Sequence, residues 1–313
     1  MSRVFEALVK AGEQKANQTA SINEVIEEAV ETTPSIKSNG ANPEWQLGEN
    51  GKARNGRRAF SPIVPAPKSW RERIEELLFG WDLRRYANCP LVALEKDSAA
   101  SEQYKILREQ IKRLRREADI RLFSVTSPVK GDGKPRVAVN LAAALALDYE
   151  ENVLLIDADM RAPSVHRYFE LNASPGLSDY LGSDTSLADI GSLVQETFLP
   201  GLRVLPAGKP TNFASELLAK DKMRQLVEDI RTTFSGCHIV VDTPPILSTP
   251  DPLIVARHVD GVLLVVRAGK TPRDYVTKSV QLLNSTKLMG IVLNGAELGM
   301  ASKYYYYSYT PSN

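Results

Sequence analysis

Residues 121–140 read RLFSVTSPVKGDGKPRVAVN, and this stretch decides the fold. A short apolar run predicts a buried strand, a polar loop follows it, and an apolar-periodic segment predicts a helix beyond. Strand, glycine loop, lysine and helix is the order of a phosphate-binding loop, whose backbone N–H groups point at phosphate oxygens. Gly131 and Gly133 allow the loop to turn, and Lys134 supplies a point charge. The stretch therefore predicts a nucleotide site.

One position departs from this pattern. After Gly-Lys the pattern has Ser or Thr, whose hydroxyl binds magnesium and whose backbone N–H faces a phosphate. This chain has Pro135 there, followed by Arg136. Proline suits the first turn of a helix but has neither a hydroxyl nor an N–H. The phosphate site is therefore predicted to lack one magnesium ligand.

Composition limits the class of protein. The 313 residues are 43% hydrophobic and 25% charged, which suffices for one large core with appendages. A net charge of +1 gives no general attraction to nucleic acid, and we predict no such partner. The two cysteines are too few for a disulfide framework or a metal cluster. No apolar run approaches the ~20 residues that span a bilayer, and no signal peptide is evident, so we expect a cytoplasmic protein.

The N-terminal part of the chain predicts appendages to the main domain. Residues 1–12 predict an amphipathic helix that docks on a partner or a membrane surface, or else folds back on its own domain. Residues 13–69 are rich in Asn, Thr, Ser, Pro, Gly and Glu and predict a flexible linker. Residues 70–89 predict a second amphipathic helix and a connector. The main domain is expected from residue 90 to residue 297.

A stronger helix is predicted from Ser101 to Glu117, with an apolar stripe formed by Tyr104, Leu107, Ile111 and Leu114. Glu102, Lys105 and Arg108 lie three residues apart along another side. They could make ion pairs between subunits. The alternative is pairing within an exposed helix, which is normally the commoner case.

Acidic residues end two predicted strands. NVLLID (152–157) ends in Asp157, with Asp159 two residues beyond, and CHIVVD (237–242) ends in Asp242 before Thr-Pro-Pro. The carboxyl ends of parallel strands face the ligand crevice, so we expect all three carboxylates there. One would orient a nucleophile or take its proton, and the others would hold magnesium through water. An ordinary helix N-cap cluster is the alternative for the first two acids, but no helix signal follows directly.

Other strands are predicted at residues 202–206, 261–267 and 289–294, and helices at residues 134–147, 213–233, 252–258 and 272–283. Strands that alternate with helices predict an α/β fold, with a doubly wound, mainly parallel sheet between two helical layers.

The C-terminal segment, residues 298–313, is predicted to be flexible. Five of the chain's eleven tyrosines lie in its last ten residues: Tyr304, Tyr305, Tyr306, Tyr307 and Tyr309. Their spacing follows neither a strand nor a helix period. We interpret them as acceptors of phosphate, with a terminal strand as the alternative.

Together these residues resemble the bacterial tyrosine autokinases of capsule and exopolysaccharide synthesis, a branch of the deviant-Walker P-loop class. The resemblance runs from about Pro90 to the C-terminus. It rests on TSPVKGDGK, LLIDADMR and VVDTPP, on the tyrosine tail, and on the lesser strings PGLSDYLG, LRVLPAGKP, GVLLVVRAGKTPR and GIVLNG. Partition ATPases of the same class carry a lysine early in the loop, where this chain has Val129, and lack the tail. They are a distant alternative.

The resemblance implies roles for individual residues. Lys134 would hold the β- and γ-phosphates, Asp157 would act as the base or orient the hydroxyl, and Asp159 and Asp242 would surround Mg²⁺. The implied nucleotide-binding residues are Gly131, Asp132, Gly133, Lys134, Pro135, Arg136, Arg161 and Asn294, the last beside adenine. Glu102, Lys105 and Arg108 resemble the oligomerisation motif, which normally has arginine at the middle basic position.

The resemblance also implies ATP and Mg²⁺ as cofactors, a homo-oligomeric ring and phosphorylation of each tail by a neighbouring subunit. A membrane activator of the chain-length-regulator (co-polymerase) type and a tyrosine phosphatase are the implied partners. Pro135 leaves two interpretations open: a slow but working autokinase, and a pseudokinase that serves as substrate or scaffold. The four intact groups Lys134, Asp157, Asp159 and Asp242 favour the first.

Overall fold

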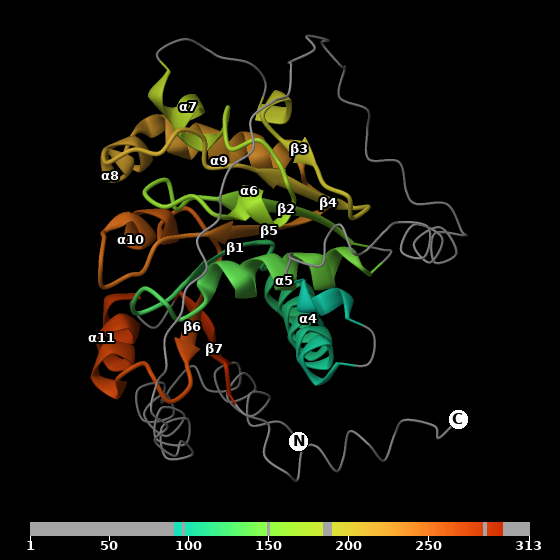
Figure 1. Ribbon diagram of the computed structural model, residues 1–313. Coiled ribbons are helices and arrows are strands. Elements are labelled where there is room, and N and C mark those ends of the chain that lie inside the picture. The colour runs from blue at the N-terminus through green and yellow to red at the C-terminus, as the bar shows by residue number, and fades with distance from the viewer. Residues whose placement is uncertain (1–90, 96–97, 149–150, 184–189, 284–286, 297–313) are drawn as a thin grey trace.

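The computed structural model describes residues 91–95, 98–148, 151–183, 190–283 and 287–296 (Figure 1). The predicted N-terminal helices, the linker and the tyrosine tail lie outside these residues.

A single seven-stranded sheet organises the domain, with the strand order β3-β4-β2-β5-β1-β6-β7. All pairs are parallel except β3 with β4. The strands are β1 (Leu122–Thr126), β2 (Asn152–Asp157), β3 (Gln195–Glu196), β4 (Leu202–Leu205), β5 (Cys237–Asp242), β6 (Gly261–Arg267) and β7 (Leu288–Asn294). The predicted parallel sheet is confirmed.

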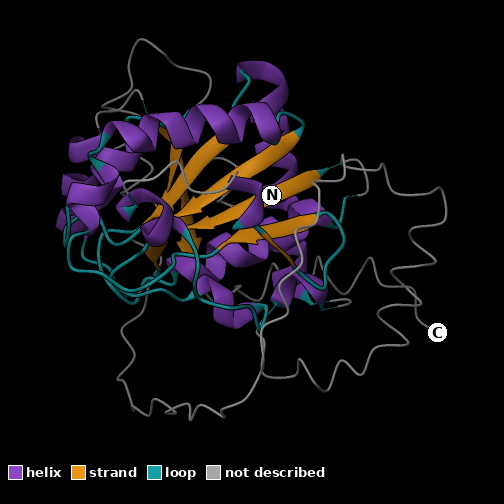
Figure 2. Ribbon diagram, turned by 90° about the horizontal axis from the view of Figure 1, so that it is seen from above, coloured by secondary structure: helices purple, strands orange, loops and turns teal. Residues whose placement is uncertain are grey.

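Helices cover both faces of the sheet and give three layers (Figures 1 and 2). One face carries η2 (Val92–Leu94), α4 (Ala99–Ala118), α5 (Lys134–Ala146) and α6 (Val165–Tyr168). The other carries α7 (Leu177–Gly182), η3 (Ile190–Ser192), α8 (Ala214–Leu218), α9 (Asp221–Thr233), α10 (Asp251–Ala256) and α11 (Arg273–Leu283). Side chains of β5 show why both faces need cover: Ile239 and Val241 enter one core and Val240 enters the other.

Helix α5 is buried from Val137 to Ala146 because α4 packs over it. The predicted stripe of α4 supplies this cover, with Leu107 and Ile111 buried. Within α5 the buried Asn140 is satisfied on both sides, since its Oδ1 accepts from Ala93 N at 3.0 Å and its Nδ2 donates to Arg136 O at 2.8 Å. The phosphate loop therefore leads into a rigid helix.

Two features differ from the sequence prediction. The helix expected over 213–233 is two helices, α8 and α9, because Lys220 between them has an extended backbone (φ −68°, ψ 151°). The antiparallel strand β3 was not predicted, since two residues carry no period. None of the helices in the described part of the chain combines the length and hydropathy needed to cross a bilayer.

Candidate functional site

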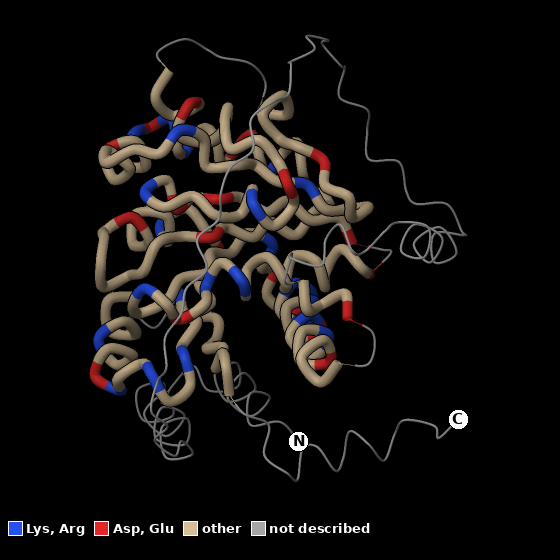
Figure 3. The backbone as a smooth tube through the Cα atoms, in the orientation of Figure 1, with Lys and Arg blue, Asp and Glu red and all other residues tan. Residues whose placement is uncertain are grey.

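The predicted phosphate loop and the strand-end acids meet at one edge of the sheet. β1 lies between β5 and β6, and β2 pairs with the other side of β5. Because these strands are parallel, the segments after them leave from the same edge. Asp157 and Asp242 are register partners across β2 and β5. Figure 3 shows Lys, Arg, Asp and Glu positions at both ends of the domain, among them positions at this edge, on the left.

Lys134 is the cation of the site. Its Nζ donates to Asp159 Oδ2 at 2.8 Å, and both side chains are less than one-tenth exposed. Burial alone would lower the pKa of Lys134, but the carboxylates of Asp242 and Asp159 outweigh it and raise the pKa. A charged amine is therefore held among carboxylates where a phosphate is expected.

Asp157 is fixed by backbone donors. Its Oδ1 accepts from Asp159 N at 3.1 Å, and its Oδ2 accepts from Ser164 N at 2.9 Å and Val165 N at 3.0 Å. Burial raises the pKa of Asp157 to about 6, although these hydrogen bonds act to lower it. Val165 begins α6, so Asp157 also satisfies the N-terminus of a helix that the sequence did not reveal. The N-cap residue of α6 is Ser164 and not Asp157, and the catalytic role of Asp157 stays a prediction.

Asp242 carries an unsatisfied carboxylate. Its side chain is fully buried, and neither carboxylate oxygen has a hydrogen-bond partner. Burial raises the pKa of Asp242 to about 8, although the Lys134 charge acts in the opposite direction. Such a carboxylate suits Mg²⁺, which uses one or two protein carboxylates and completes its shell with water and phosphate oxygens. Within the described residues no group of three or more His, Cys, Asp and Glu forms a metal site unaided. Asp159 and Asp242 are the two carboxylates predicted to lie near such an ion, and this assignment stays a prediction.

The burial of Asp242 predicts a pH-dependent stability. Its pKa is higher in the folded chain than in the unfolded chain, so the folded state binds the extra proton between about pH 4 and pH 8. Stability should fall as pH rises through this range, by up to ~1.4 kcal/mol per pH unit for one proton. Asp157 contributes to the same fall in stability only up to about pH 6, because its pKa is raised only to that value. Asp242→Asn should therefore flatten the slope between pH 6 and pH 8.

Urea unfolding of the ligand-free parent and Asp242→Asn proteins at half-unit pH steps measures this slope. Histidine effects are common to both proteins and cancel in the difference. Identical slopes in the two proteins would show that Asp242 is ionised in the folded state well below pH 6.

Asp132 holds the phosphate loop in shape. Its Oδ2 accepts from Val129 N at 3.2 Å, its Oδ1 accepts from Thr271 Oγ1 at 2.7 Å, and its backbone carbonyl accepts from Asn294 Nδ2 at 2.8 Å. Thr271 follows β6 and was missed in the sequence, because a hydroxyl that bonds 139 residues away leaves no local pattern. Asp132 and Asn294, both predicted to bind nucleotide, are brought together as a clamp on the loop.

Two loop glycines offer a matched pair of substitutions. Gly131 and Gly133 have φ of +97° and +89°, which strains any residue with a Cβ. A Cβ on Gly133 would lie 2.2 Å from Asn294 Nδ2, whereas one on Gly131 would meet nothing within 4 Å. Gly131→Ala should cost ~1–2 kcal/mol through the backbone alone. Gly133→Ala should cost distinctly more and displace Asn294.

Denaturant unfolding of both variants provides the measurement, with Gly131→Ala as the control for backbone strain. Equal losses would mean that Asn294 moves aside freely and does not clamp the loop.

Pro135 lies in the first turn of α5, after the N-cap residue Gly133. The first helical hydrogen bond runs from Val137 N to Gly133 O, so an N–H at position 135 would have no partner within the helix. The proline therefore removes no hydrogen bond from α5. It removes only an N–H that could donate to a phosphate, if one binds here. Arg136 is exposed on the next position of the turn.

Arg161 takes its hydrogen-bond partners from a second network, which does not include Lys134. Its Nε donates to Asp251 Oδ2 at 2.8 Å, and its two Nη atoms donate to Asn212 O at 3.1 Å and Ser215 Oγ at 2.9 Å. Asp251 is fully buried. The guanidinium predicted to bind nucleotide thus joins the segment after β2 to α8 and α10.

Glu102, Lys105 and Arg108 all take partners within α4. Lys105 Nζ lies 2.5 Å from Glu102 Oε1, and Arg108 Nη2 lies 2.8 Å from Glu109 Oε1. The first pair is the intrahelical pairing named above as the alternative. A role in oligomerisation stays a prediction.

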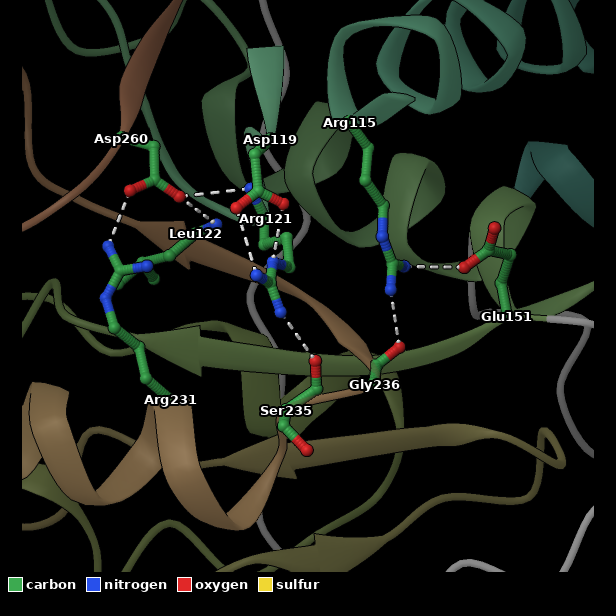
Figure 4. A network of polar contacts seen from close by, with 9 residues as sticks. All are labelled: Arg115, Asp119, Arg121, Leu122, Glu151, Arg231, Ser235, Gly236 and Asp260. Atoms are coloured by element: carbon green, nitrogen blue, oxygen red, sulfur yellow. Dashed lines mark hydrogen bonds and ion pairs between the residues drawn. The ribbon is translucent and has the colours of Figure 1, made fainter. Parts of the chain in front are cut away.

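A cavity of about 470 Å³ lies at the opposite edge of the sheet, lined by Lys112, Arg115, Arg116, Asp119, Arg121 and Glu151. Its charges are largely paired (Figure 4). Arg115 bonds Glu151 and Gly236 O, and Arg121 bonds Asp119 and Ser235 O. Asp260 accepts from Arg231 and from the N–H groups of Arg121 and Leu122, which completes the network. These contacts join α4 to the amino ends of the strands and contain none of the predicted site residues.

Comparison with known proteins identifies relatives that are named tyrosine-protein kinases. No protein-family model matches the chain. It is 34% identical over 215 residues to the tyrosine-protein kinase YwqD of Bacillus subtilis, covering 68% of this chain and 88% of the relative. It is 33% identical over 221 residues to the putative tyrosine-protein kinase CapB of Staphylococcus aureus, covering 70% and 94%. It is 32% identical to the tyrosine-protein kinase ptk of Acinetobacter johnsonii but spans only 28% of that longer protein.

Solved structures give the same result. The kinase domain of the Escherichia coli tyrosine kinase ETK superposes with a TM-score of 0.61 at 31% identity, covering 67% of this chain and 82% of that one. The BceF tyrosine kinase domain superposes with a TM-score of 0.60 at 28% identity, covering 75% and 93%.

Proposed function

The chain belongs to the family of bacterial tyrosine-protein kinases, and from that premise we propose that it transfers the γ-phosphoryl group of ATP to tyrosines of its own C-terminal segment. The observation that supports this most strongly is the buried Lys134–Asp159 pair beside the partnerless carboxylate of Asp242. Burying such charges without a ligand is unfavourable, which favours a site built for one.

Lys134 would exchange Asp159 for the β- and γ-phosphates of ATP. The buried amine is already charged and already faces the site, so it needs little reorganisation. Gly131 and Gly133 would direct backbone N–H groups at the same phosphates. Bound Mg²⁺, held by Asp159 and Asp242, would neutralise charge that develops on the transferred group.

Asp157 would orient the acceptor tyrosine and accept its proton. A base with a pKa of about 6 is some four units weaker than a tyrosine phenolate, so it does not ionise the phenol in advance. The proton would move to Asp157 as the new oxygen–phosphorus bond forms and the bond to ADP breaks, in keeping with a loose transition state. Its three backbone hydrogen bonds keep the carboxylate in place.

Pro135 favours a second candidate function, in which the protein is a pseudokinase of the same system. Without the hydroxyl and N–H at this position, nucleotide could bind while transfer remains slow. The chain would then act as a phosphorylated subunit or a scaffold.

Membership of the family also supports a proposal about the biological process and the partners, whichever of the two functions holds. We infer a role in regulating capsule or exopolysaccharide polymerisation and export, with a membrane co-polymerase-type activator and a tyrosine phosphatase as partners. The protein would work at the cytoplasmic face of the inner membrane, held there by the activator. Glu102, Lys105 and Arg108 would form ring contacts by exchanging their intrahelical partners for those of a neighbour.

Phosphorylation of the tail tests the proposal. The full chain with Mg-ATP should gain phosphate on residues 304–309, detectable by mass spectrometry of the C-terminal peptide. Replacing Tyr304, Tyr305, Tyr306, Tyr307 and Tyr309 with Phe should remove all phosphotyrosine. A signal that persists on other residues contradicts the proposed acceptor.

Mixing two variants tests transfer between subunits. The five-Phe chain keeps its catalytic residues but has no acceptor, and an Asp242→Asn chain keeps the tail but lacks a proposed magnesium ligand. Phosphate on the Asp242→Asn chain in the mixture, and on neither variant alone, supports transfer in trans. No phosphate in any sample, with the activator present, would favour the pseudokinase.

A further inference from the structure

Phe213 exposes its aromatic ring to solvent. The ring is 69% exposed, more than any other large hydrophobic side chain in the described ranges. It lies in the connection between β4 and α8, as the N-cap residue of α8. Single exposed apolar residues are common and need no explanation by themselves. The backbone around this one is what sets it apart.

Arg161 clamps the chain on both sides of Phe213. One guanidinium nitrogen donates to Asn212 O, immediately before the phenylalanine, and the other donates to Ser215 Oγ, two residues after it. The buried carboxylate of Asp251 accepts from Arg161 and from the same serine hydroxyl. The Asp251 carboxylate is buried and the Arg161 side chain is partly exposed, and charge-assisted hydrogen bonds of this kind hold their partners in a defined geometry. This network therefore presents an exposed ring on a rigid support.

Hydrogen bonds of the neighbouring backbone also fix where Phe213 lies. Thr211 N donates to Met160 O at 2.9 Å, and Phe213 N donates to Thr211 Oγ1 at 3.1 Å. Met160 directly follows Asp159, which holds Lys134. The connection after β4 leaves from the carboxyl edge of the sheet, because β4 is parallel to β2. Phe213 thus lies in a loop at the same edge of the sheet as the candidate active site, and this edge is called the rim below.

The chain itself supplies an aromatic segment for this rim. The described part ends at residue 296, shortly after β7, which leaves from the same edge of the sheet. Seventeen residues follow, and five of them are tyrosines. Aromatic rings pair with each other by ~0.5–1.5 kcal/mol beyond their area burial.

We propose that Phe213 docks the tyrosine-rich segment of a second copy of this chain by ring-to-ring contact and so places an acceptor hydroxyl at Asp157. Phe213 is then a specificity-determining residue for acceptor binding, and the Arg161–Asp251 pair positions it. The identity of the segment as acceptor rests on the proposed function.

Binding of the isolated segment tests the proposal without requiring catalysis. The probe is a fluorescent peptide of residues 299–313, and the protein is the full chain with its five tail tyrosines changed to Ser, so that its own tail does not compete. Phe213→Ser removes the ring and supplies a residue favoured at a helix N-cap, so α8 should keep its start. Its dissociation constant for the peptide should rise at least about 5-fold. Phe213→Tyr, which keeps a ring, should bind within about 2-fold of the parent.

Leu282→Ser is the matched control. Leu282 is 43% exposed near the end of α11, away from the carboxyl edge where that helix begins. It should leave peptide binding unchanged, and a peptide with serine for each tyrosine should not bind. Mg-ADP affinity, measured on every variant, reports an intact nucleotide site.

The proposal is overturned by no binding of the peptide by the parent, by equal binding by Phe213→Ser, or by an equal loss in Leu282→Ser. A fall in Mg-ADP affinity alone in Phe213→Ser overturns it too, since the ring would then contact nucleotide. Failure of phosphate transfer with peptide binding intact counts against the proposed kinase activity and leaves the docking role standing.

Discussion

Lys134→Met should abolish phosphotyrosine formation and, in the ligand-free protein, lower the free energy of unfolding by ~3–5 kcal/mol. The amine is the cation that compensates the buried carboxylates of Asp157, Asp159 and Asp242. Without the amine, the carboxylates remain buried but lose their counter-charge. Removing one partner of a buried ion pair is strongly destabilising for this reason. The rate should fall at least ~100-fold, as when one preorganised charge stabiliser is removed.

The stability loss should itself depend on pH. Protonation relieves repulsion among carboxylates, so Lys134→Met should be much closer to the parent at pH 5.5 than at pH 8. Urea unfolding at both values measures it. Lys105→Met is the control, because the Lys105–Glu102 pair is exposed and should contribute under ~1 kcal/mol. Adding Asp159→Asn to Lys134→Met should recover part of the loss. A Lys134→Met protein as stable as the parent at pH 8 would contradict the compensating role of the Lys134 charge.

Pro135→Ser should strengthen the binding of ADP in the presence of Mg²⁺ by ~10-fold or more. The serine restores a backbone donor to phosphate and a hydroxyl to the metal, and a net hydrogen bond to a charged group is worth ~1.5–3 kcal/mol. Helix α5 should tolerate the change, because position 135 donates no hydrogen bond within the helix.

Calorimetric titration with ADP, with and without Mg²⁺, measures both proteins. Pro135→Ala is the matched control: it restores the N–H without the hydroxyl, so it should improve ADP binding but not its response to magnesium. If the parent already responds to Mg²⁺ as strongly as Pro135→Ser, Pro135 is no defect and the autokinase is favoured. If only the serine variant responds, the pseudokinase is favoured.

The sequence revealed those parts of the site that depend on short segments. The bounds of β2, β5 and β6 follow from mainly apolar runs, and the terminal acids Asp157 and Asp242 follow from the ends of the first two runs. A parallel sheet then brings these acids to one edge.

What the sequence did not reveal depends on contacts between distant segments. Thr271 meets Asp132 and Asp251 meets Arg161 only after the sheet has assembled. Neither residue lies in a local pattern that distinguishes it from an ordinary turn or helix start. Likewise, the short helix α6 becomes visible only when Asp157 accepts its first N–H groups.

The strand order has a consequence for how the protein is made. β1, which carries the phosphate loop, pairs with β5 and β6, and its residue Leu122 is opposite Ile239. More than a hundred residues must be synthesised after β1 before β5 or β6, its two neighbours in the sheet, is available for pairing. Pairings of such long sequence separation form slowly and leave apolar strands exposed in the meantime. The nucleotide site is therefore among the last parts to form during synthesis, and an N-terminal fragment that ends before β5 should need chaperone protection and bind no nucleotide.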